Sequence, residues 1–480
     1  MSSDLLSTRF RYALLAFLAG LTALFPAESD ALAHDNLVHT TASTDSGWKA
    51  GVATEVITPD ESMWMAGYAV RNREAEGKQH DLYAKALALE DGDGNQILLV
   101  TTDLLGIPTA LSNRIRDRIG QAYGLERSAI LLNSSHTHSA PVLEGALLDI
   151  YPLNEERMQP IHRYTATLED QVVDLAGRAL NRLAPASVSS ANGTARFQVN
   201  RRNNDAETLH LQTDLNGPID HAVPVIKVTS PDGELLAIAF GYACHPTVLD
   251  GYEWSGDYPG YAQIELEKLY PGTTALFFQG AGADQNPLPR RETRLAIQYG
   301  KTLAASVEAV LSGEMQELSP TLSHAYSEVK LPLRETASRE YLEQLADESL
   351  EYIQRWAKRI LKEMDEGKEF ARTYPYPVQS WMIGEQPVFS LGGELTVGYA
   401  NKLKQMYGPD IFVMGYSNDV TGYIPTTRIL QEGGYEGHSS HKVYGLPAPW
   451  TPDTETMIFQ RLIQVANEAG VPHAPPTRNY

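Results

Sequence analysis

Histidines follow two of the strand-like segments of this chain. His136 and His138 stand two positions apart, just after the apolar segment 129–132, and His245 follows the apolar segment 235–243. Side chains at i and i+2 of an extended chain lie on the same side, so one imidazole can face a metal ion while its neighbour faces a substrate. Neutral imidazole is a common zinc ligand, and a catalytic zinc site keeps one position open for water. The histidine pattern is compatible with a metal centre and equally with a structural role, in which His245 is a core histidine bonded to backbone.

Two further apolar segments, 275–278 and 411–414, also end in small and polar residues. Sheets of α/β proteins place their sites at such strand ends, because chain reversals there leave a crevice open. Asp284 lies in the loop after 275–278, and a carboxylate beside a metal-activated water can accept a proton. The alternative for Asp284 is a cap or turn carboxylate that holds the glycine-rich loop 280–287.

The elements that must position these residues alternate between strand-like and helix-like up to about residue 311. The apolar run 97–102 predicts a buried strand, the spacing within 111–123 predicts a helix, and a second helix ends before Pro185. This alternation is typical of an α/β protein. We expect a layered, mixed-sheet hydrolase domain with helices packed on its sheets, forming a single large domain over residues 48–480.

The C-terminal part adds two helices to this picture. Residues 338–367 are highly charged and predict one long helix with Ser338 as its N-cap and a solvent-exposed charged face. A short helix is predicted over 454–469 near the end of the chain.

Composition excludes several classes of protein. The 480 residues carry a formal net charge of −21, which argues against a nucleic-acid-binding protein, because Lys and Arg must neutralise phosphates there. With 42% hydrophobic residues the chain can bury a core, which argues against disorder. Cys244 is the single cysteine, so the fold has no intrachain disulfide and any metal must be bound by His, Asp, Glu or Tyr.

The first 33 residues resemble an export signal. Arg9 and Arg11 precede a short apolar stretch, 12–25, and residues 31–33 form an A-x-A cleavage site. The stretch is too short for a stable membrane span, although an uncleaved N-terminal anchor is the alternative. We expect a signal peptide over 1–33, a flexible lead-in over 34–47, and an exported (periplasmic or secreted) protein.

An ordered set of short segments carries a resemblance to a known family. The segments are 53–59, 65–68, 81–86, 101–103, 135–139, 199–201, 244–246, 255–262, 393–395 and 421–423. Together they resemble the neutral/alkaline non-lysosomal ceramidase family. The resemblance spans most of the chain after the leader, and it implies hydrolysis of a linear amide in a lipid-like, sphingolipid-type substrate.

The resemblance also implies a single catalytic zinc ion. Its ligands here would be His136, His245, Glu394 and Tyr423. Imidazole and carboxylate are ordinary zinc ligands, and a phenol can join them if the cation lowers its pKa. Glu394 follows two glycines, which permit a close approach of the backbone. The alternative for Glu394 is a solvated turn carboxylate.

Further residues would surround the scissile amide by the same resemblance. The matching positions are His138, Arg201 and Tyr435, and preorganised donors of this kind stabilise a tetrahedral oxyanion. Arg201 has an alternative role as the partner of a structural carboxylate such as Asp103 or Asp257.

Two departures from the family pattern bear on function. The ceramidases carry a serine, proposed as the nucleophile, in the loop that corresponds to the one after the apolar segment 275–278. Asp284 stands at that position here. We therefore expect water activated by the metal, with Asp284 as its base. A serine nucleophile at Ser134, Ser135 or Ser139 is disfavoured, because no G-x-S-x-G turn surrounds any of them. The better-known ceramidases also continue into a C-terminal β-sandwich, which we do not expect in a chain that stops at Tyr480.

The sequence thus predicts an exported zinc-dependent hydrolase of an N-acyl, ceramide-like amide. Two alternatives remain beside it: a catalytically silent ligand-binding member of the same scaffold, and an esterase.

Overall fold

The computed structural model describes residues 47–147, 149–212, 214–347 and 350–473. The predicted signal peptide and almost all of the predicted lead-in lie outside the described residues. The described elements belong to one compact unit. Among them, no helix is both long and apolar enough to cross a membrane.

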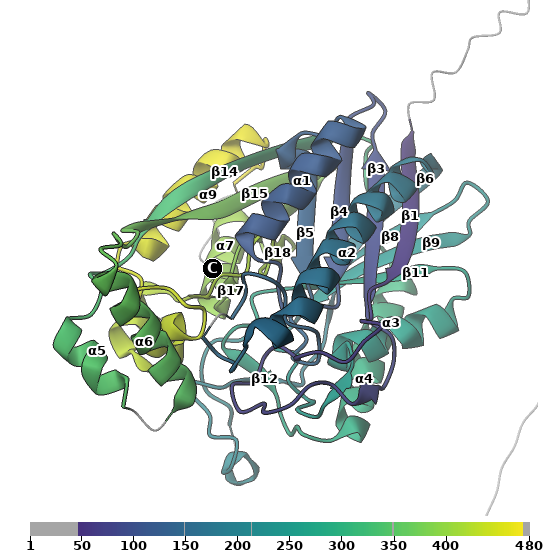
Figure 1. The fold of residues 1–480 in the computed structure, drawn as a ribbon. Coiled ribbons are helices and arrows are strands. Elements are labelled where there is room, and N and C mark those ends of the chain that lie inside the picture. The colour runs from purple at the N-terminus through teal and green to yellow at the C-terminus, as the bar shows by residue number, and fades with distance from the viewer. Residues whose placement is uncertain (1–46, 148, 213, 348–349, 474–480) are drawn as a thin grey trace, which may run out of the picture. The chain divides into compact units, whose positions relative to one another are not determined.

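The larger of the two main sheets has nine strands and mixes parallel with antiparallel neighbours (Figure 1). Its order is β11-β9-β8-β6-β1-β3-β4-β5, with β13 paired to β6. The pairs β4/β5 and β9/β11 run parallel, and the other pairs are antiparallel. The strands are β1 (Trp48–Val56), β3 (Tyr83–Glu90), β4 (Gln96–Thr102), β5 (Ile130–Ser134), β6 (Ala184–Thr194), β8 (Ala222–Thr229), β9 (Leu235–Tyr242), β11 (Thr274–Gln279) and β13 (Gln316–Glu317).

Four helices cover this sheet. They are α1 (Thr109–Tyr123), α2 (Glu155–Leu180), α3 (Asp257–Leu269) and α4 (Thr293–Leu311). Helix α2 packs on β1, β3 and β4 beside α1, whereas α4 packs on β6 and β8, and α3 on β11 (Figure 1). Strand β4 is buried along almost its whole length, which explains its unbroken apolar sequence. The expected α/β class, with helices packed on mixed sheets, is confirmed.

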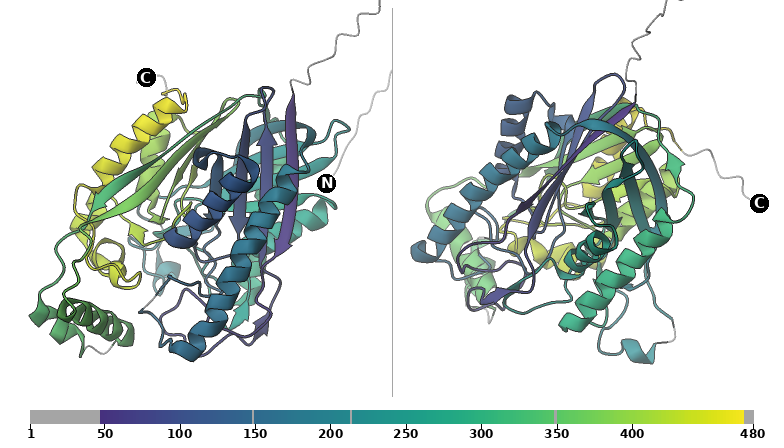
Figure 2. Two further views of the ribbon diagram at one scale, coloured as in Figure 1. Left: turned by 45° about the horizontal axis from the view of Figure 1, so that its top comes forward. Right: turned by 90° about the vertical axis from the view of Figure 1, so that its right-hand side faces the viewer.

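A smaller sheet of four strands forms the second layer. Its order is β14-β15-β16-β18, and only the β16/β18 pair is parallel within it. Its elements are β14 (Leu322–Pro332), β15 (Thr373–Ile383), β16 (Gln386–Leu391), β18 (Phe412–Met414), α7 (Val397–Tyr407) and α9 (Thr454–Glu468). Helix α9, which the sequence predicts, lies along β14 and β15 (Figure 2).

The single long helix predicted over 338–367 is wrong. The structure has two helices there, α5 (Arg339–Leu345) and α6 (Glu351–Asp365), which pack against each other (Figure 1). Leu342 and Leu345 of α5 share a small core with Trp356 and Ile360 of α6. One straight helix cannot bring these apolar positions together, so burial favours the hairpin. The predicted N-cap is confirmed, because the Ser338 side chain accepts a hydrogen bond from the N–H of Tyr341.

Short strand pairs tie the loops together. They are β2 (Gly77–Lys78) with β10 (Glu253–Trp254), β7 (Gln198–Asn200) with β12 (Gln285–Pro287), and β17 (Glu394–Leu395) with β19 (Tyr423–Ile424). Helix α8 (Thr427–Glu432) and a π-helical turn (Tyr435–Ser439) follow β19.

The side chain of Asn133 joins three strand ends. It lies in β5, its Oδ1 accepts from the N–H of Gln279 at the end of β11, and its Nδ2 donates to the carbonyl of Gly415 just after β18, each at 2.8 Å. Strands β5 and β11 are the two ends of the large-sheet order, yet this amide holds them together. Polar loops that are far apart in the sequence therefore meet at one place.

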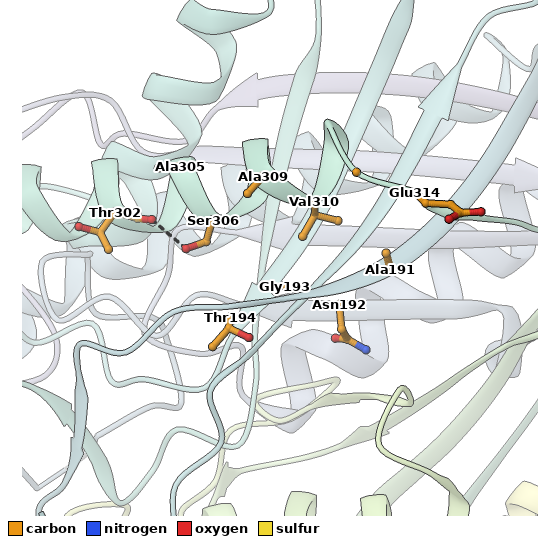
Figure 3. A pocket seen from close by; sticks show the side chains of 11 residues that line it. Ala191, Asn192, Gly193, Thr194, Thr302, Ala305, Ser306, Ala309, Val310 and Glu314 are labelled. Atoms are coloured by element: carbon orange, nitrogen blue, oxygen red, sulfur yellow. Dashed lines mark hydrogen bonds between the residues drawn. The ribbon is translucent and has the colours of Figure 1, made fainter. Parts of the chain in front are cut away.

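A separate hollow carries no comparable chemistry. It is a groove of about 690 Å³ between β6 and α4, lined by small residues such as Gly193, Ala305 and Ala309, with Glu314 as its one charged lining residue (Figure 3). The histidines and Glu394 lie instead at the strand ends.

Candidate metal centre

His136 and His138 direct their rings toward one another. Nε2 of His136 lies 3.3 Å from Nε2 of His138. The spacing of the two histidines predicted an extended chain over 136–138. The backbone differs from this, because His136 is left-handed, with a φ of +66°. Tyr416, whose ring lies 4.5 Å from that of His136, also has a positive φ of +50°. Left-handed backbone at non-glycine residues is costly and tends to cluster at functional sites.

His245 joins them from the end of β9. Its ring lies 4.6 Å from that of His136, measured between centroids. Nδ1 of His136 donates to the carbonyl of Leu105 at 2.5 Å, and Nδ1 of His245 contacts the carbonyl of Gly282 at 3.3 Å. A carbonyl only accepts, so each Nδ1 carries the proton and each Nε2 keeps its lone pair. Both rings are thus in the tautomer that binds a cation through Nε2.

Glu394 brings a carboxylate to the same point. Its Oε2 lies 3.3 Å from Nε2 of His136 and 3.5 Å from Nε2 of His245. The preceding Gly393 has a φ of +68°, and a Cβ there would come within 2.6 Å of Ile424. Only glycine therefore lets β17 approach β19 this closely. The solvated-turn alternative for Glu394 is excluded, because the residue is buried.

The two distances from Oε2 of Glu394 to the histidine nitrogens match the spacing of neighbouring ligands in a zinc site. Zinc bonds of about 2.0–2.2 Å place neighbouring ligand atoms about 3.3–3.6 Å apart. Nε2 of His245 and Oε2 of Glu394 are buried and have no hydrogen-bond partner among the described residues. One nitrogen from each of His136, His138 and His245 also fits within 4.8 Å of the others, so a three-histidine set is a second arrangement that could bind a metal.

Burial keeps two of these imidazoles neutral. The pKa of His138 and that of His245 are lowered well below the usual value, first by burial and then by the nearby His136. Neutral imidazole is the form that coordinates a metal.

Tyr423 lies next to Glu394 in the β17/β19 pair, where the two residues are direct partners. Its hydroxyl accepts a hydrogen bond of 3.0 Å from Arg201, and Nε of Arg201 donates to Glu436 at 2.8 Å. The pairing of Arg201 with Asp103 or Asp257 is therefore wrong; its carboxylate partner is Glu436. Burial raises the pKa of Tyr423 well above its usual value.

A sequence model of the family described as neutral/alkaline non-lysosomal ceramidase, N-terminal, matches residues 48–322. The chain belongs to this family. Neutral ceramidase A of Dictyostelium discoideum is 26% identical over 277 residues, which are 53% of this chain and 38% of that protein. The neutral ceramidase of Drosophila melanogaster is 26% identical over 238 residues, 46% of this chain and 32% of the relative. This chain therefore matches well under half the length of these curated relatives.

The fold agrees with this family. The crystal structure of neutral ceramidase from Pseudomonas aeruginosa superposes with a TM-score of 0.68 at 19% identity, over 90% of this chain and 76% of that one. A structure described as ceramidase complexed with C2 gives the same TM-score at 18% identity.

Among the described residues, the Asp284 side chain forms no hydrogen bond with His136, His138 or His245. Its Oδ1 accepts from the N–H of Val397 at 2.8 Å, and its Oδ2 accepts from Asn200 at 3.3 Å. These are the contacts of a cap, the alternative role considered from the sequence. Burial raises the pKa of Asp284 to about 6.

Tyr435 lies at the edge of the candidate metal centre, beside Tyr423 and Arg201. Its ring is 5.2 Å from that of Tyr423, and 41% of the residue is exposed. The guanidinium of Arg201 lies 5.9 Å from its ring centroid. Tyr435 is therefore an exposed residue beside the buried Tyr423.

Sequence reasoning missed two tyrosines of this site. Tyr444 donates a hydrogen bond to Oε1 of Glu394, and Tyr68 places its ring 4.7 Å from that of His138. Tyr68 lies inside a segment that matches the family, which was a usable signal. Nothing in the local pattern around Tyr444 indicates its contact with Glu394.

Proposed function

We propose that this protein is an exported, zinc-dependent hydrolase that cleaves the amide bond of an N-acyl, ceramide-like lipid. The observation that carries the proposal is the meeting of Nε2 of His136 with the buried, unpartnered Nε2 of His245 and Oε2 of Glu394. A buried carboxylate oxygen and a buried imidazole nitrogen without partners are costly unless a cation satisfies them.

His136, His245 and Glu394 would hold the ion, with Tyr423 as the fourth ligand. When bound there, zinc would polarise the amide carbonyl and lower the pKa of a water molecule. We prefer this ligand set to the set of His136, His138 and His245 because it includes a carboxylate. Oε2 of Glu394 lies within 3.5 Å of the Nε2 atoms of His136 and His245. This set also leaves His138 available for the substrate.

His138 and Arg201 would orient the amide. A neutral imidazole can donate one hydrogen bond and accept another, which suits a carbonyl oxygen and an amide N–H. Arg201 is fixed by Glu436 on one side and points to the hydroxyl of Tyr423 on the other. A guanidinium held in this way favours negative charge that develops nearby. Tyr435, at the exposed edge, would contact the substrate as it enters.

We assign Asp284 a positioning role in place of the base expected from the sequence. Both of its oxygens already accept hydrogen bonds, one from the first residue of α7. Val397 comes three residues after Glu394, so the cap fixes the segment that carries this donor.

The substrate class rests on the family and on what its named relatives act on. Neutral ceramidases from two eukaryotes match this chain, and ceramide is an N-acyl lipid with a linear amide. Export rests on the leader-like sequence of residues 1–33.

Metal analysis and turnover on one preparation test the proposal. We expect one zinc per chain, release of fatty acid from N-acyl amides, and loss of both in the Glu394→Gln variant. A folded protein that binds zinc but hydrolyses no amide would support the silent binding alternative instead.

A further inference from the structure

Three arginines border the histidine centre on the side of His138. Arg71 donates to the carbonyl of His138 at 2.7 Å. Arg291 donates at 2.7 Å to the hydroxyl of Tyr68, whose ring lies against that of His138. Arg290 donates at 3.2 Å to the hydroxyl of Thr247, two residues after His245.

These arginines have few negative partners. Arg290 is half-buried and forms no ion pair with the described residues, and its only side-chain hydrogen bond there goes to Thr247. Arg71 is buried and donates only to backbone carbonyls, while its Nε has no partner among the described residues. Among the described residues Arg291 forms one ion pair, with Asp250 at 3.4 Å, and the Asp250 side chain is 52% exposed. Asp250 also acts on Arg290, and the buried Asp257 is close enough for Arg291 to lower its pKa, so the positive charge is offset only in part.

Arg201 and Arg202, which lie near Tyr423, differ because each forms an ion pair with a carboxylate. Arg201 and Arg202 share Glu436, at 2.8 and 2.6 Å, and Arg202 also pairs with Glu432. Around the histidine centre, the arginines that form no ion pair with a buried carboxylate of the described residues therefore lie on the side of Tyr68, Arg290 and Arg291. They occur in a chain whose net charge is −21, so they do not reflect a generally basic surface.

The excess charge is also electrostatically costly. The pKa of Arg290 is lowered by burial and then by its neighbour Arg291. An anion bound close to both guanidinium groups would relieve this repulsion, and guanidinium matches the planar fork of a carboxylate or the oxygens of a phosphate or sulfate.

We propose that Arg290 and Arg291 form a subsite for an acidic group, and that the amide cleaved here is anionic close to its scissile bond. The acidic group is a carboxylate, sulfate or phosphate on the N-acyl compound. This inference rests on the proposed amide hydrolysis and narrows its substrate class, because a neutral ceramide offers these arginines no charge.

Two amides that differ in one group test the inference. N-dodecanoylglycine carries a carboxylate where N-dodecanoylethanolamine carries a hydroxymethyl group. With the zinc-loaded full-length protein we expect kcat/KM to be about tenfold or more higher for the anionic amide, as one charge-assisted hydrogen bond provides. Arg290→Gln should remove most of this preference. Arg290→Lys should retain part of it, because lysine keeps the positive charge but lacks the planar guanidinium that can donate two parallel hydrogen bonds.

Arg294→Gln is the matched control. Arg294 has the same side chain only four residues along the chain, is 69% exposed and pairs with Glu292 at 2.6 Å. We expect its anionic-to-neutral ratio to equal that of the wild type.

Equilibrium binding separates failure of the inference from failure of the proposed function. Equal kcat/KM values for the two amides, or an unchanged ratio in Arg290→Gln, would overturn the anionic subsite while leaving amide hydrolysis intact. If neither amide is hydrolysed, the proposed function fails, and calorimetric binding of the same two amides then decides the subsite. Tighter binding of N-dodecanoylglycine that Arg290→Gln abolishes supports it, and equal binding overturns it.

Discussion

Oδ1 of Asp284 accepts a hydrogen bond of 2.8 Å from the backbone N–H of Val397, the first residue of α7, across 113 positions of sequence. A carboxylate at this place satisfies one of the free N–H groups of the first turn and complements the positive end of the helix dipole. It also ties the loop after β11 to the segment that begins with Glu394. Asp284 therefore connects two of the strand ends that build the metal centre.

Substitution of Asp284 by Asn should preserve the site. Asparagine keeps an oxygen that can accept from Val397, so we expect zinc content and kcat within a few-fold of the wild type. Asp284→Ala should lower the free energy of unfolding by about 0.5–2 kcal/mol, as the loss of a helix cap does. Chemical denaturation and turnover of both variants check this. A folded, zinc-loaded Asp284→Asn protein with kcat reduced a hundredfold would instead identify Asp284 as the base.

Tyr444 should tune metal affinity through Glu394. Its hydroxyl donates to Oε1, which leaves Oε2 facing the two histidines. Loss of such an outer hydrogen bond typically weakens metal binding about 10–100-fold, and we expect this of Tyr444→Phe in competition titrations with a zinc chelator. Tyr407→Phe is the control, because the Tyr407 hydroxyl is also buried without a hydrogen-bond partner among the described residues but lies at the C-terminal end of α7, packed against Phe389. Equal zinc affinities of the two variants would contradict the assignment.

Single substitutions distinguish the two possible donor sets. If His136, His245 and Glu394 hold the ion, His138→Ala should keep about one zinc per chain and lose turnover, whereas His245→Ala should lose the zinc. Elemental analysis after dialysis measures this directly. Loss of zinc from both variants would favour the three-histidine set.

Asp257 should make stability fall with rising pH. It is buried at the start of α3, and burial raises its pKa to about 7. In the unfolded chain the carboxyl loses its proton near pH 4, so between about pH 4 and 7 the folded state holds the extra proton. The free energy of unfolding contributed by this group therefore decreases as pH rises, by about 2–3 kcal/mol between pH 5 and 7.

Asp257→Asn removes this titration. Urea unfolding at pH 5 and pH 7 should show that the stability of the wild type relative to the variant drops over this interval. A pH-independent difference between the two proteins would mean that Asp257 is ionised in the folded state throughout.

The sequence alone indicated the class of the fold and most of its elements. Strands and helices with strong apolar periodicity, such as β4, β11, α1 and α9, lie where the sequence predicted them. When one or both faces of a helix or strand are buried, its apolar residues recur at a fixed spacing. This spacing is local in the chain, so the sequence alone shows it. The pattern over 338–367 predicts one helix, because periodicity does not reveal where the chain breaks and turns back so that two helices pack their apolar faces together.

The candidate site was only partly accessible in this way. His136, His245, Glu394 and Tyr423 came from resemblance to the family, and without it Glu394 would read as an exposed turn residue. Tertiary structure alone decided that Glu394 faces both histidines, that Asp284 caps α7, that Glu436 is the partner of Arg201 and that Tyr444 holds Glu394. Each of these contacts joins residues far apart in sequence, and whether two such side chains meet depends on how sheets and loops pack, which no local pattern records.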